Sequence, residues 1–333
     1  MLPTPVKANR LAHYLQGYDE GLKEYIINGF TYGFSLHAEN FHTPSIAPRN
    51  TTIALKNPDA VTEKINKELQ LKHIAGPFET PPMPAFHVSP LSLRPKADNS
   101  GWRLLHDLSF PYNDQSVNCS IPDNYKKVEY SSIQSAIKLI QYLGPSTNLS
   151  KSDIQSAFAQ IPINPADYHL LGFKWQGQYY HYTTLPQGAA SSCRIFEAVA
   201  TALHWILTEK FQLPHVIHYL DDFLFLHKTP EGSKRMLATF HALCTDIGIP
   251  INHQKTEGPS TALSFLGIQL DTVNNKATLP LDKVQRYTSL MHDILKSKTC
   301  KLHEMQKIIG SLHLPLQWLH LAECSSAGSS ILQ

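Results

Sequence analysis

Two adjacent acidic residues interrupt an apolar, strand-forming stretch in the second half of the chain. In "HYLDDFLFL", residues 218–226, Asp221 and Asp222 lie between aromatic and aliphatic residues that favour β-structure. Two unit charges about 4 Å apart repel by roughly 4 kcal/mol at the effective dielectric near a protein surface. A hairpin with both aspartates at its tip would let solvent screen them, and this plain turn is what the pair alone favours. The same tip could also supply half of a divalent-cation site.

Asp153 is a third carboxylate with a suggestive position. The stretch "STNLSKSDIQSAF", residues 146–158, predicts a strand that runs into a helix, with Asp153 at the junction. The ordinary role of an aspartate there is to cap the helix. If Asp153 instead adjoins the Asp221-Asp222 tip, the three carboxylates offer the oxygen ligands that Mg²⁺ prefers, with phosphate oxygens and waters as the remainder. The cations would then offset the repulsion between the carboxylates.

The elements that must position these residues alternate between helices and antiparallel hairpins, which favours an α+β body over a doubly wound parallel sheet. A hairpin is expected to turn at Gln176-Gly177, and residues 1–55, rich in turn formers, are expected to form an extended arm on the main body. His215 and His218 would point to opposite faces of a strand, which disfavours a metal site. The other expected helices are 58–78, with Gly-Pro as its stop, 131–143, 188–210, 231–248 and 281–321, and the other expected strands lie in 85–109 and 262–272.

The composition is that of a globular protein. The chain has 333 residues, 42% of them hydrophobic, and a net charge of +2 with 18 histidines, which permits a nucleic-acid partner without requiring one. Its five cysteines are scattered and never spaced as C-x-x-C, which disfavours a disulfide framework or a zinc site. We find neither a leader pattern nor a membrane-spanning run, and therefore expect an intracellular protein, cytoplasmic or nuclear.

Taken together, the motifs resemble those of the reverse transcriptases. "YLDD" is similar to the Y-x-D-D hairpin of that family, "SDIQSAF" to its first aspartate motif, "LPQGAASS" to its nucleotide-pocket turn and "FLGIQLD" to its primer-grip strand pair. They occur in the family's order between about residues 85 and 270. Within the family, "GPFETPP", "SPLSLRPKADNSGWRLLHDLSFP", "SVN" and "LLGFKWQGQYY" most resemble polymerases of DIRS-like retrotransposons, which carry a tyrosine recombinase.

This resemblance implies a right-hand polymerase that adds deoxynucleotides to a primer 3′-hydroxyl on an RNA or DNA template. Asp153 and Asp221 would be shared ligands of two Mg²⁺ ions, with Mn²⁺ as an alternative. Asp222 would lie beside them, and the carbonyl of Ile154 would add an oxygen. Lys255 aligns loosely with a family lysine thought to protonate pyrophosphate, although a lone loop lysine is ordinarily only solvated.

The resemblance also implies a nucleotide pocket and a primer contact. Each of these residues has a plainer role in isolation, as a solvated charge, a turn or a core aromatic. Phe158 would face the sugar of the incoming nucleotide. The other implied positions are Lys96 and Arg103 on the triphosphate, Gln187 and Gly188 along the nucleotide, Tyr219 and Leu220 beneath the primer end, and Phe265, Leu266 and Gly267 as the primer grip.

We therefore expect an arm over residues 1–55, interleaved fingers and palm over 56–270, and a truncated helical thumb or connection over 271–333. No ribonuclease H, protease, integrase or recombinase segment is recognisable, so we expect a fragment of a longer polyprotein or a truncated copy. One alternative is a decayed or domesticated copy that binds nucleic acid without polymerising. A metal-dependent hydrolase with three carboxylates is a third alternative, but it leaves Lys96, Arg103 and "LPQG" unexplained.

Overall fold

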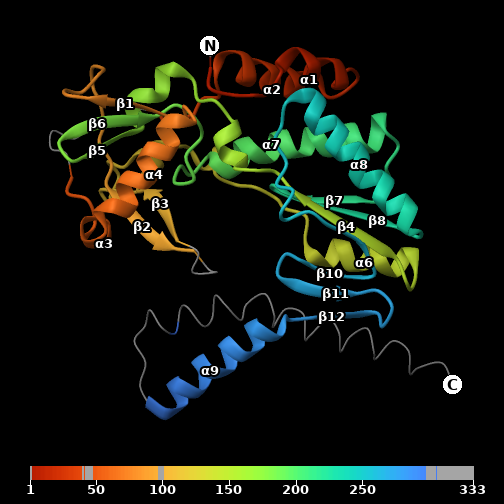
Figure 1. Ribbon diagram of the computed structural model, residues 1–333. Helices are drawn as coiled ribbons and strands as arrows, with labels where there is room; N and C mark the ends of the chain where they lie inside the picture. Colours follow the sequence, from red (N-terminus) through yellow and green to blue (C-terminus); the bar gives the residue numbers. More distant parts are fainter. Residues whose placement is uncertain (1, 40, 42–47, 97–100, 298–304, 306–333) are drawn as a thin grey trace.

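The computed structural model describes residues 2–39, 41, 48–96, 101–297 and 305. These residues form a mixed structure of helices and small antiparallel sheets (Figure 1). The expected α+β class is confirmed. Most of the stretch from 298 onward, on which the thumb prediction partly falls, lies outside the described residues.

The central sheet has four strands in the order β7-β8-β4-β9, and all neighbouring pairs are antiparallel. Because side chains alternate along a strand, β8 contributes to two separate cores. Phe223 and Phe225 pack on one face with residues of α7 and α8, whereas Leu224 and Leu226 pack on the other with α6, β10 and β11. The bounds are β4 (Asn148–Asp153), β7 (Val216–Tyr219), β8 (Asp222–His227), β9 (Glu257–Ser260), β10 (Ala262–Phe265), β11 (Ile268–Asp271), β12 (Lys276–Thr278), α6 (Ile133–Leu143), α7 (Ser192–Trp205) and α8 (Pro230–Ile247).

Two side-chain hydrogen bonds join α8 to β4 on the sheet face that α7 and α8 cover. The hydroxyls of Ser150 and Ser233 lie 2.7 Å apart, and Ser152 Oγ lies 2.9 Å from His241 Nε2. Both serines of β4 are buried, so these bonds satisfy polar groups that would otherwise be costly to remove from water.

A second region carries its own core, drawn on the other side of Figure 1 from the central sheet. Its buried side chains include Val61 and Ile65 of α4, Leu91 and Leu93 of β2, and Phe173 of β5. The predicted turn at Gln176-Gly177 joins β5 to β6. The bounds are α3 (Thr52–Lys56), α4 (Pro58–Gln70), β1 (Ile74–Phe78), β2 (Leu91–Pro95), β3 (Trp102–His106), β5 (Gly172–Trp175) and β6 (Gln178–Tyr182).

Several predicted helix ends coincide with capping groups. Ser132 begins α6 by accepting a hydrogen bond from the Ser135 amide, and Thr229 does the same for α8 with the Gly232 amide. Gly248 ends α8 in a left-handed conformation with φ of 85°. Beyond the sheets, α9 (Leu281–Ser297) confirms the first part of the helical stretch expected from residue 281.

Three local expectations were wrong, two of them in the first 78 residues. Residues 1–55 are not simply extended, because they contain α1 (Ala8–Tyr14), α2 (Glu20–Tyr32) and α3. Leu11 and Leu15, one helical turn apart, and Ile26 and Phe30 are buried, and this spacing was the missed signal. The expected 58–78 helix ends at Gln70, so that Ile74, expected on its apolar face, instead begins strand β1.

The junction after Asp153 also differs from the expected helix. Strand β4 ends at Asp153, Ser156 adopts a left-handed φ of 49°, and a short 3₁₀ turn, η2 (Ala157–Gln160), follows. Because no α-helix begins there, Asp153 is not a helix cap, and its carboxylate has no capping bond to make.

Candidate active site

The three predicted carboxylates come together at one end of the central sheet. Asp153 of β4 lies directly opposite Asp222 of β8 in the antiparallel register. Tyr219 pairs with Asp222, so the hairpin turns through Leu220 and Asp221, and Leu220 has a φ of 52°. The Ile154 amide donates to the Asp221 carbonyl at 3.1 Å. The tip of the hairpin is thereby fixed against the end of β4.

Strand alternation assigns the facing pair to one side of the sheet. On β4, Leu149 belongs to the core formed with α6, β10 and β11, and Lys151 Nζ donates to the Ser264 carbonyl of β10 at 2.8 Å. Asp153 is an even number of residues from Leu149 and Lys151, so its side chain lies on the same face of β4. By the same alternation, the side chain of Asp222 lies on the same face of β8 as Leu224 and Leu226. The carboxylates of this pair therefore lie on the sheet face away from α7 and α8.

Burial and mutual repulsion act on these carboxyls in the same direction. The pKa of Asp222 is raised to about 6, first by burial and then by the charges of Asp221 and Asp153. The pKa of Asp221 is also raised, by burial and by Asp153. Such a cluster gains most from a bound cation near neutral pH, because deprotonation would otherwise leave like charges close together.

Lys255 contacts the carboxylate cluster through Asp153. Its Nζ donates to Asp153 Oδ2 at 2.9 Å, and the Asp153 side chain is only 7% exposed. Burial alone would lower the pKa of Lys255, but the hydrogen bond to Asp153 and the three carboxylates outweigh it and raise the pKa. The Asn252 amide, donating to the Asp153 carbonyl at 2.8 Å, brings the lysine's loop to this strand end.

The donor set suits a hard cation in type, since it consists of carboxylate oxygens. Across the described ranges, no three His, Cys, Asp or Glu side chains converge closely enough to hold a metal by themselves. Mg²⁺ does not require such a cage, because it commonly takes one or two carboxylates and completes its shell with substrate phosphates and water. The residues therefore fit a cation that binds together with a phosphate ligand.

The predicted "LPQG" turn packs tightly against β3. A Cβ at Gly188 would collide with the His106 carbonyl oxygen, so only glycine permits this approach. Asn118 brackets the turn, donating to the Gly188 carbonyl at 2.9 Å and accepting from the Ala190 amide at 2.8 Å. Gln187 beside it is exposed. Sequence reasoning did not select Asn118, whose only signal was the "SVN" similarity.

Two of the predicted site residues are aromatic and partly buried, one in the 3₁₀ turn after β4 and one in the β7–β8 hairpin. Phe158, on η2, packs against Phe196 with ring centroids 5.6 Å apart. Tyr219 lies 4.8 Å from Tyr130, measured between ring centroids. Tyr130 was not selected from the sequence, because nothing local marks a residue that meets its partner across 89 positions.

The predicted basic pair lies on the β2–β3 hairpin, where Arg103 is exposed opposite Arg94. The Lys96 amide donates to the Gly101 carbonyl at 2.9 Å, and turn residues 97–100 lie outside the described residues. No contact within the described part of the chain joins either cation to the aspartates. The base of the hairpin does meet the nucleotide-pocket turn, through His106 and Gly188.

The predicted primer grip is the turn between β10 and β11. Phe265 pairs with Ile268, so Leu266 and Gly267 form the turn, with φ of 48° and 77°. Lys283 of α9 donates to the Gly267 carbonyl at 3.0 Å. The turn is therefore attached to the helix that follows the sheets.

Comparison with known proteins now identifies the family. Residues 95–270, more than half of the chain, match the model of the family described as reverse transcriptase (RNA-dependent DNA polymerase). The chain belongs to the reverse transcriptase family. The match includes Asp153, Asp221, Asp222 and Asn118, and it ends within β11, at residue 270.

Curated relatives of this reverse transcriptase chain include viral polyproteins and the Protein P of hepatitis B viruses. The Pro-Pol polyprotein of Simian foamy virus type 1 is 29% identical over 238 residues, which are 69% of this chain and 18% of the relative. Protein P of Duck hepatitis B virus (strain China) is 32% identical over 123 residues, which are 36% of this chain and 15% of the relative. The chain thus spans less than a fifth of either protein's length.

Solved structures of foamy viral protease-reverse transcriptase share the fold. One, described as protease-reverse transcriptase dRH in complex with double-stranded DNA, superposes with a TM-score of 0.63 at 17% identity, covering 92% of this chain and 52% of that one. One in complex with an RNA/DNA hybrid gives a TM-score of 0.59 at 18% identity, covering 92% and 40%. At these identities the likeness confirms the α+β polymerase fold.

Two further sequence expectations concern cysteines and membranes. Cys119, Cys193 and Cys244 are free thiols, while Cys300 and Cys324 lie outside the described residues. None of the helices among the described residues combines the length and apolar character needed to cross a bilayer.

We predict that Asp222→Asn stabilises the metal-free chain at neutral pH. Folding raises the pKa of Asp222 from its ordinary 3.8 to about 6, so the folded state holds this proton more tightly. The proton on Asp222 therefore contributes to the free energy of unfolding. This contribution is fully present below about pH 4 and is lost as the pH rises through about 6. Relative to the parent, the variant should gain on the order of 2 kcal/mol between these limits. Urea unfolding in EDTA from pH 4 to 7.5 measures this, and a pH-independent difference would contradict it.

We predict that Gly188→Ala costs about 1–3 kcal/mol, because the added methyl group must displace the His106 carbonyl or the turn itself. Gly21→Ala in α2 is the matched control, since its nearest neighbour would be Asp19 Oδ1 at 3.5 Å, an ordinary contact. That control should stabilise the chain by about 0.5–1 kcal/mol. Equal urea midpoints for Gly188→Ala and the parent would show that the turn is not tightly packed.

Proposed function

We propose that this chain is the polymerase part of an RNA-directed DNA polymerase, adding deoxynucleotides to a primer 3′-hydroxyl through a two-metal mechanism. One observation carries the proposal. In a chain of the reverse transcriptase family, Asp153 faces Asp222 across two adjoining strands, with Asp221 in the connecting turn. Lys255 contributes only one positive charge against three carboxylates, whereas phosphoryl transfer uses divalent cations at such a point.

The carboxylates and one backbone carbonyl would hold the metals. Asp153 and Asp221 would be the shared ligands, with Asp222 beside them and the Ile154 carbonyl as a further oxygen. When bound, Mg²⁺ would supply a Lewis acid that acidifies the primer hydroxyl and balances the charge of the triphosphate. Lys255 would exchange its present partner, Asp153, for the substrate's phosphates.

Lys255 is the residue that we propose as the proton donor to the departing pyrophosphate. Its ammonium lies 2.9 Å from Asp153 Oδ2 while its side chain is 63% exposed, so it can reach a phosphate without leaving the site. The raised pKa keeps this side chain protonated at neutral pH, which a donor requires.

The nucleotide would be held between the hairpin β2–β3 and the turn at Gly188. Lys96 and Arg103 would bind the triphosphate, since a point charge and a planar guanidinium both pair well with phosphate oxygens. Gln187 is exposed beside Gly188, in a turn that Asn118 holds rigid. Tyr219 and Leu220 would lie under the primer end, with the primer grip, Phe265, Leu266 and Gly267, alongside.

The proposed partners are an RNA or DNA template with its primer, and deoxynucleoside triphosphates. The related foamy viral enzyme is described in complex with double-stranded DNA and with an RNA/DNA hybrid, which supports this choice. Several relatives are polyproteins, which supports an origin in a longer product with further domains such as ribonuclease H or a recombinase. We further propose a retrotransposon of the DIRS-like type as the source, acting in the cytoplasm or nucleus.

A nucleic-acid-binding role without catalysis is the alternative function. Retention of Asp153, Asp221, Asp222 and the Lys255 contact favours catalysis, because binding alone needs no buried carboxylate cluster. Primer extension on an RNA template, with and without Mg²⁺, separates the two roles.

We predict that Asp153→Asn or Asp221→Asn abolishes Mg²⁺-dependent primer extension while template-primer affinity stays within about twofold of the parent. Loss of a metal ligand removes the chemistry, whereas nucleic-acid binding rests mainly on basic side chains that remain. Extension of a labelled primer on RNA and a fluorescence-anisotropy titration measure the two effects. The control is Asp123→Asn, which alters an exposed carboxylate paired with Lys126 and should extend normally. Parallel loss of binding and extension would contradict these roles.

We predict that Phe158→Ala admits ribonucleotides while deoxynucleotide use survives. A bulky ring under the sugar would exclude a 2′-hydroxyl by collision, which needs no added contact to the deoxynucleotide. Phe196→Ala is the matched control, because Phe196 packs against Phe158 but is fully buried. Both variants should lose up to about 3–5 kcal/mol of stability, yet only Phe158→Ala should incorporate ribonucleotides. A folded Phe158→Ala that rejects them as strongly as the parent would make Phe158 a core residue.

A further inference from the structure

The N-terminal segment makes an unexpected set of contacts to the segments that hold Asp153. Thr4 Oγ1 donates to the Gln160 carbonyl at 2.7 Å, at the end of η2. Three residues later, the Lys7 amide donates to the Ile247 carbonyl at 2.8 Å, at the end of α8. Residues 4–7 therefore bridge two segments that are far apart in the sequence.

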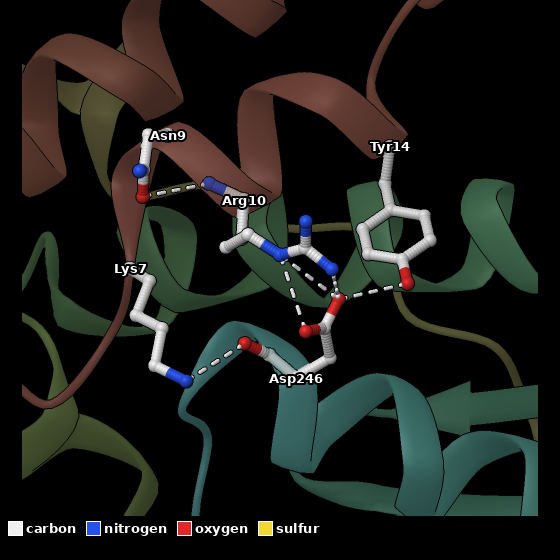
Figure 2. Close-up of polar contacts among 5 residues, drawn as sticks. All are labelled: Lys7, Asn9, Arg10, Tyr14 and Asp246. Atoms are coloured by element: carbon white, nitrogen blue, oxygen red, sulfur yellow. Dashed lines mark hydrogen bonds and ion pairs between the residues drawn. The ribbon is translucent and has the colours of Figure 1, made fainter.

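An ion pair fixes the arm to α8 (Figure 2). Arg10 donates to both carboxylate oxygens of Asp246, with its shortest contact, from a terminal guanidinium nitrogen, at 2.6 Å. Tyr14 donates to the same carboxylate at 2.9 Å, and Lys7 Nζ donates to the Asp246 carbonyl at 3.1 Å. The hydrogen bonds from Arg10 and Tyr14 lower the pKa of Asp246, so the carboxylate stays charged at neutral pH. We call residues 4–14 the N-terminal strap.

Apolar burial holds the strap in place. Val6 and Leu11 are buried in the same core as α7 and α8. The carbonyl of Pro5 lies against the Cα of Gly248, where any side chain would collide. The strap is therefore packed into the fold, and its polar contacts have a defined geometry.

The two segments that the strap contacts are both hydrogen-bonded to the backbone at or close to Asp153. From α8 the chain continues to Pro250, whose carbonyl accepts from the Gln155 amide at 2.9 Å, and to Asn252, whose amide donates to the Asp153 carbonyl at 2.8 Å. From the other side, Gln160 Nε2 donates to the Gln155 carbonyl at 2.9 Å. This bond spans the left-handed turn at Ser156, whose φ of 49° is a conformation that non-glycine residues adopt at a cost.

We propose that the N-terminal strap positions the Asp153 carboxylate, with Thr4 and the Arg10–Asp246 pair as positioning residues outside the active site. The inference rests on the proposed polymerase function. The strap bonds to Gln160 and to Ile247. Asp153 lies two residues before the segment 155–160, and Lys255 lies three residues after the segment 247–252. A displacement of about 1 Å at a reacting group can lower a rate by about 100-fold, so loosening these bonds should be visible in catalysis.

The experiment compares variants that differ in one strap contact. Thr4→Val removes the hydroxyl that binds Gln160 and keeps the side-chain shape, while Thr4→Ser keeps the hydroxyl. Arg10→Asp breaks the pair with Asp246, and the double exchange Arg10→Asp with Asp246→Arg restores opposite charges. Lys23→Glu is the control, since it reverses a charge in an ion pair with Glu20 on the neighbouring α2.

Extension of oligo(dT) on poly(rA) with dTTP and Mg²⁺ gives the first readout, below the unfolding temperature of every variant. We expect kcat to fall about tenfold in Thr4→Val and Arg10→Asp, with KM for dTTP within about twofold of the parent. Thr4→Ser and Lys23→Glu should match the parent, and the double exchange should recover part of the loss. This split between kcat and KM is what a positioning role predicts.

Amide hydrogen exchange of the metal-free chain gives the second readout, which needs no activity. Residues 153–160 should exchange about tenfold faster in Thr4→Val and Arg10→Asp, while β10 and β11 stay unchanged. If the parent fails to extend the primer, the proposed function fails and the exchange result still decides on the strap. Lower urea midpoints with unaltered kcat and unaltered exchange at 153–160 would overturn the inference. The strap would then contribute to stability alone.

Discussion

Repulsion between the carboxylates at the end of β4 and at the tip of the β7–β8 hairpin is the constraint that organises the rest of the molecule. The sheet register sets Asp153 opposite Asp222, and burial prevents solvent from screening the charges fully. The surrounding contacts limit how far these groups can separate. Lys255 supplies one positive charge, the Ile154 amide ties the hairpin tip to β4, and backbone bonds from residues 250 and 252 hold the strand end.

The two faces of the central sheet divide the tasks of stability and chemistry. The face toward α7 and α8 is closed by aromatic packing, in which the Phe223 and Phe240 rings stack at 4.6 Å between centroids. The face with Asp153 and Asp222 carries the smaller core of α6 and the β10–β11 hairpin. Strand β8 contributes side chains to both faces. Packing against α7 and α8 therefore also fixes the backbone that carries the Asp222 carboxylate on the other face.

Much of this architecture could be predicted from local patterns. The helices at α4, α6 and α8 have marked starts, and the hairpins at Gln176-Gly177 and Asp221 have turn formers between strand-forming runs. The carboxylate site was predictable because its motifs are short and contiguous. The left-handed turn at Ser156 and the bracket at Asn118 were not, since each depends on partners that are distant in the chain. The helices of the first 55 residues were missed because the turn formers around them outweighed the apolar spacing of Leu11, Leu15, Ile26 and Phe30, which the structure shows to be buried.

The hydroxyl contacts between β4 and α8 have a consequence for how this domain can vary. Apolar packing is non-directional, so a helix lying on a sheet by such contacts alone can slide along it. The Ser150–Ser233 and Ser152–His241 bonds fix α8 at two points eight residues apart, a separation of about 12 Å along the helix axis. The position of the helix along β4 is therefore fixed by these two bonds. The number of residues between Ser233 and His241 is constrained even where the apolar residues of the helix can be exchanged. Insertions and deletions between these two residues should consequently be tolerated far less well than substitutions.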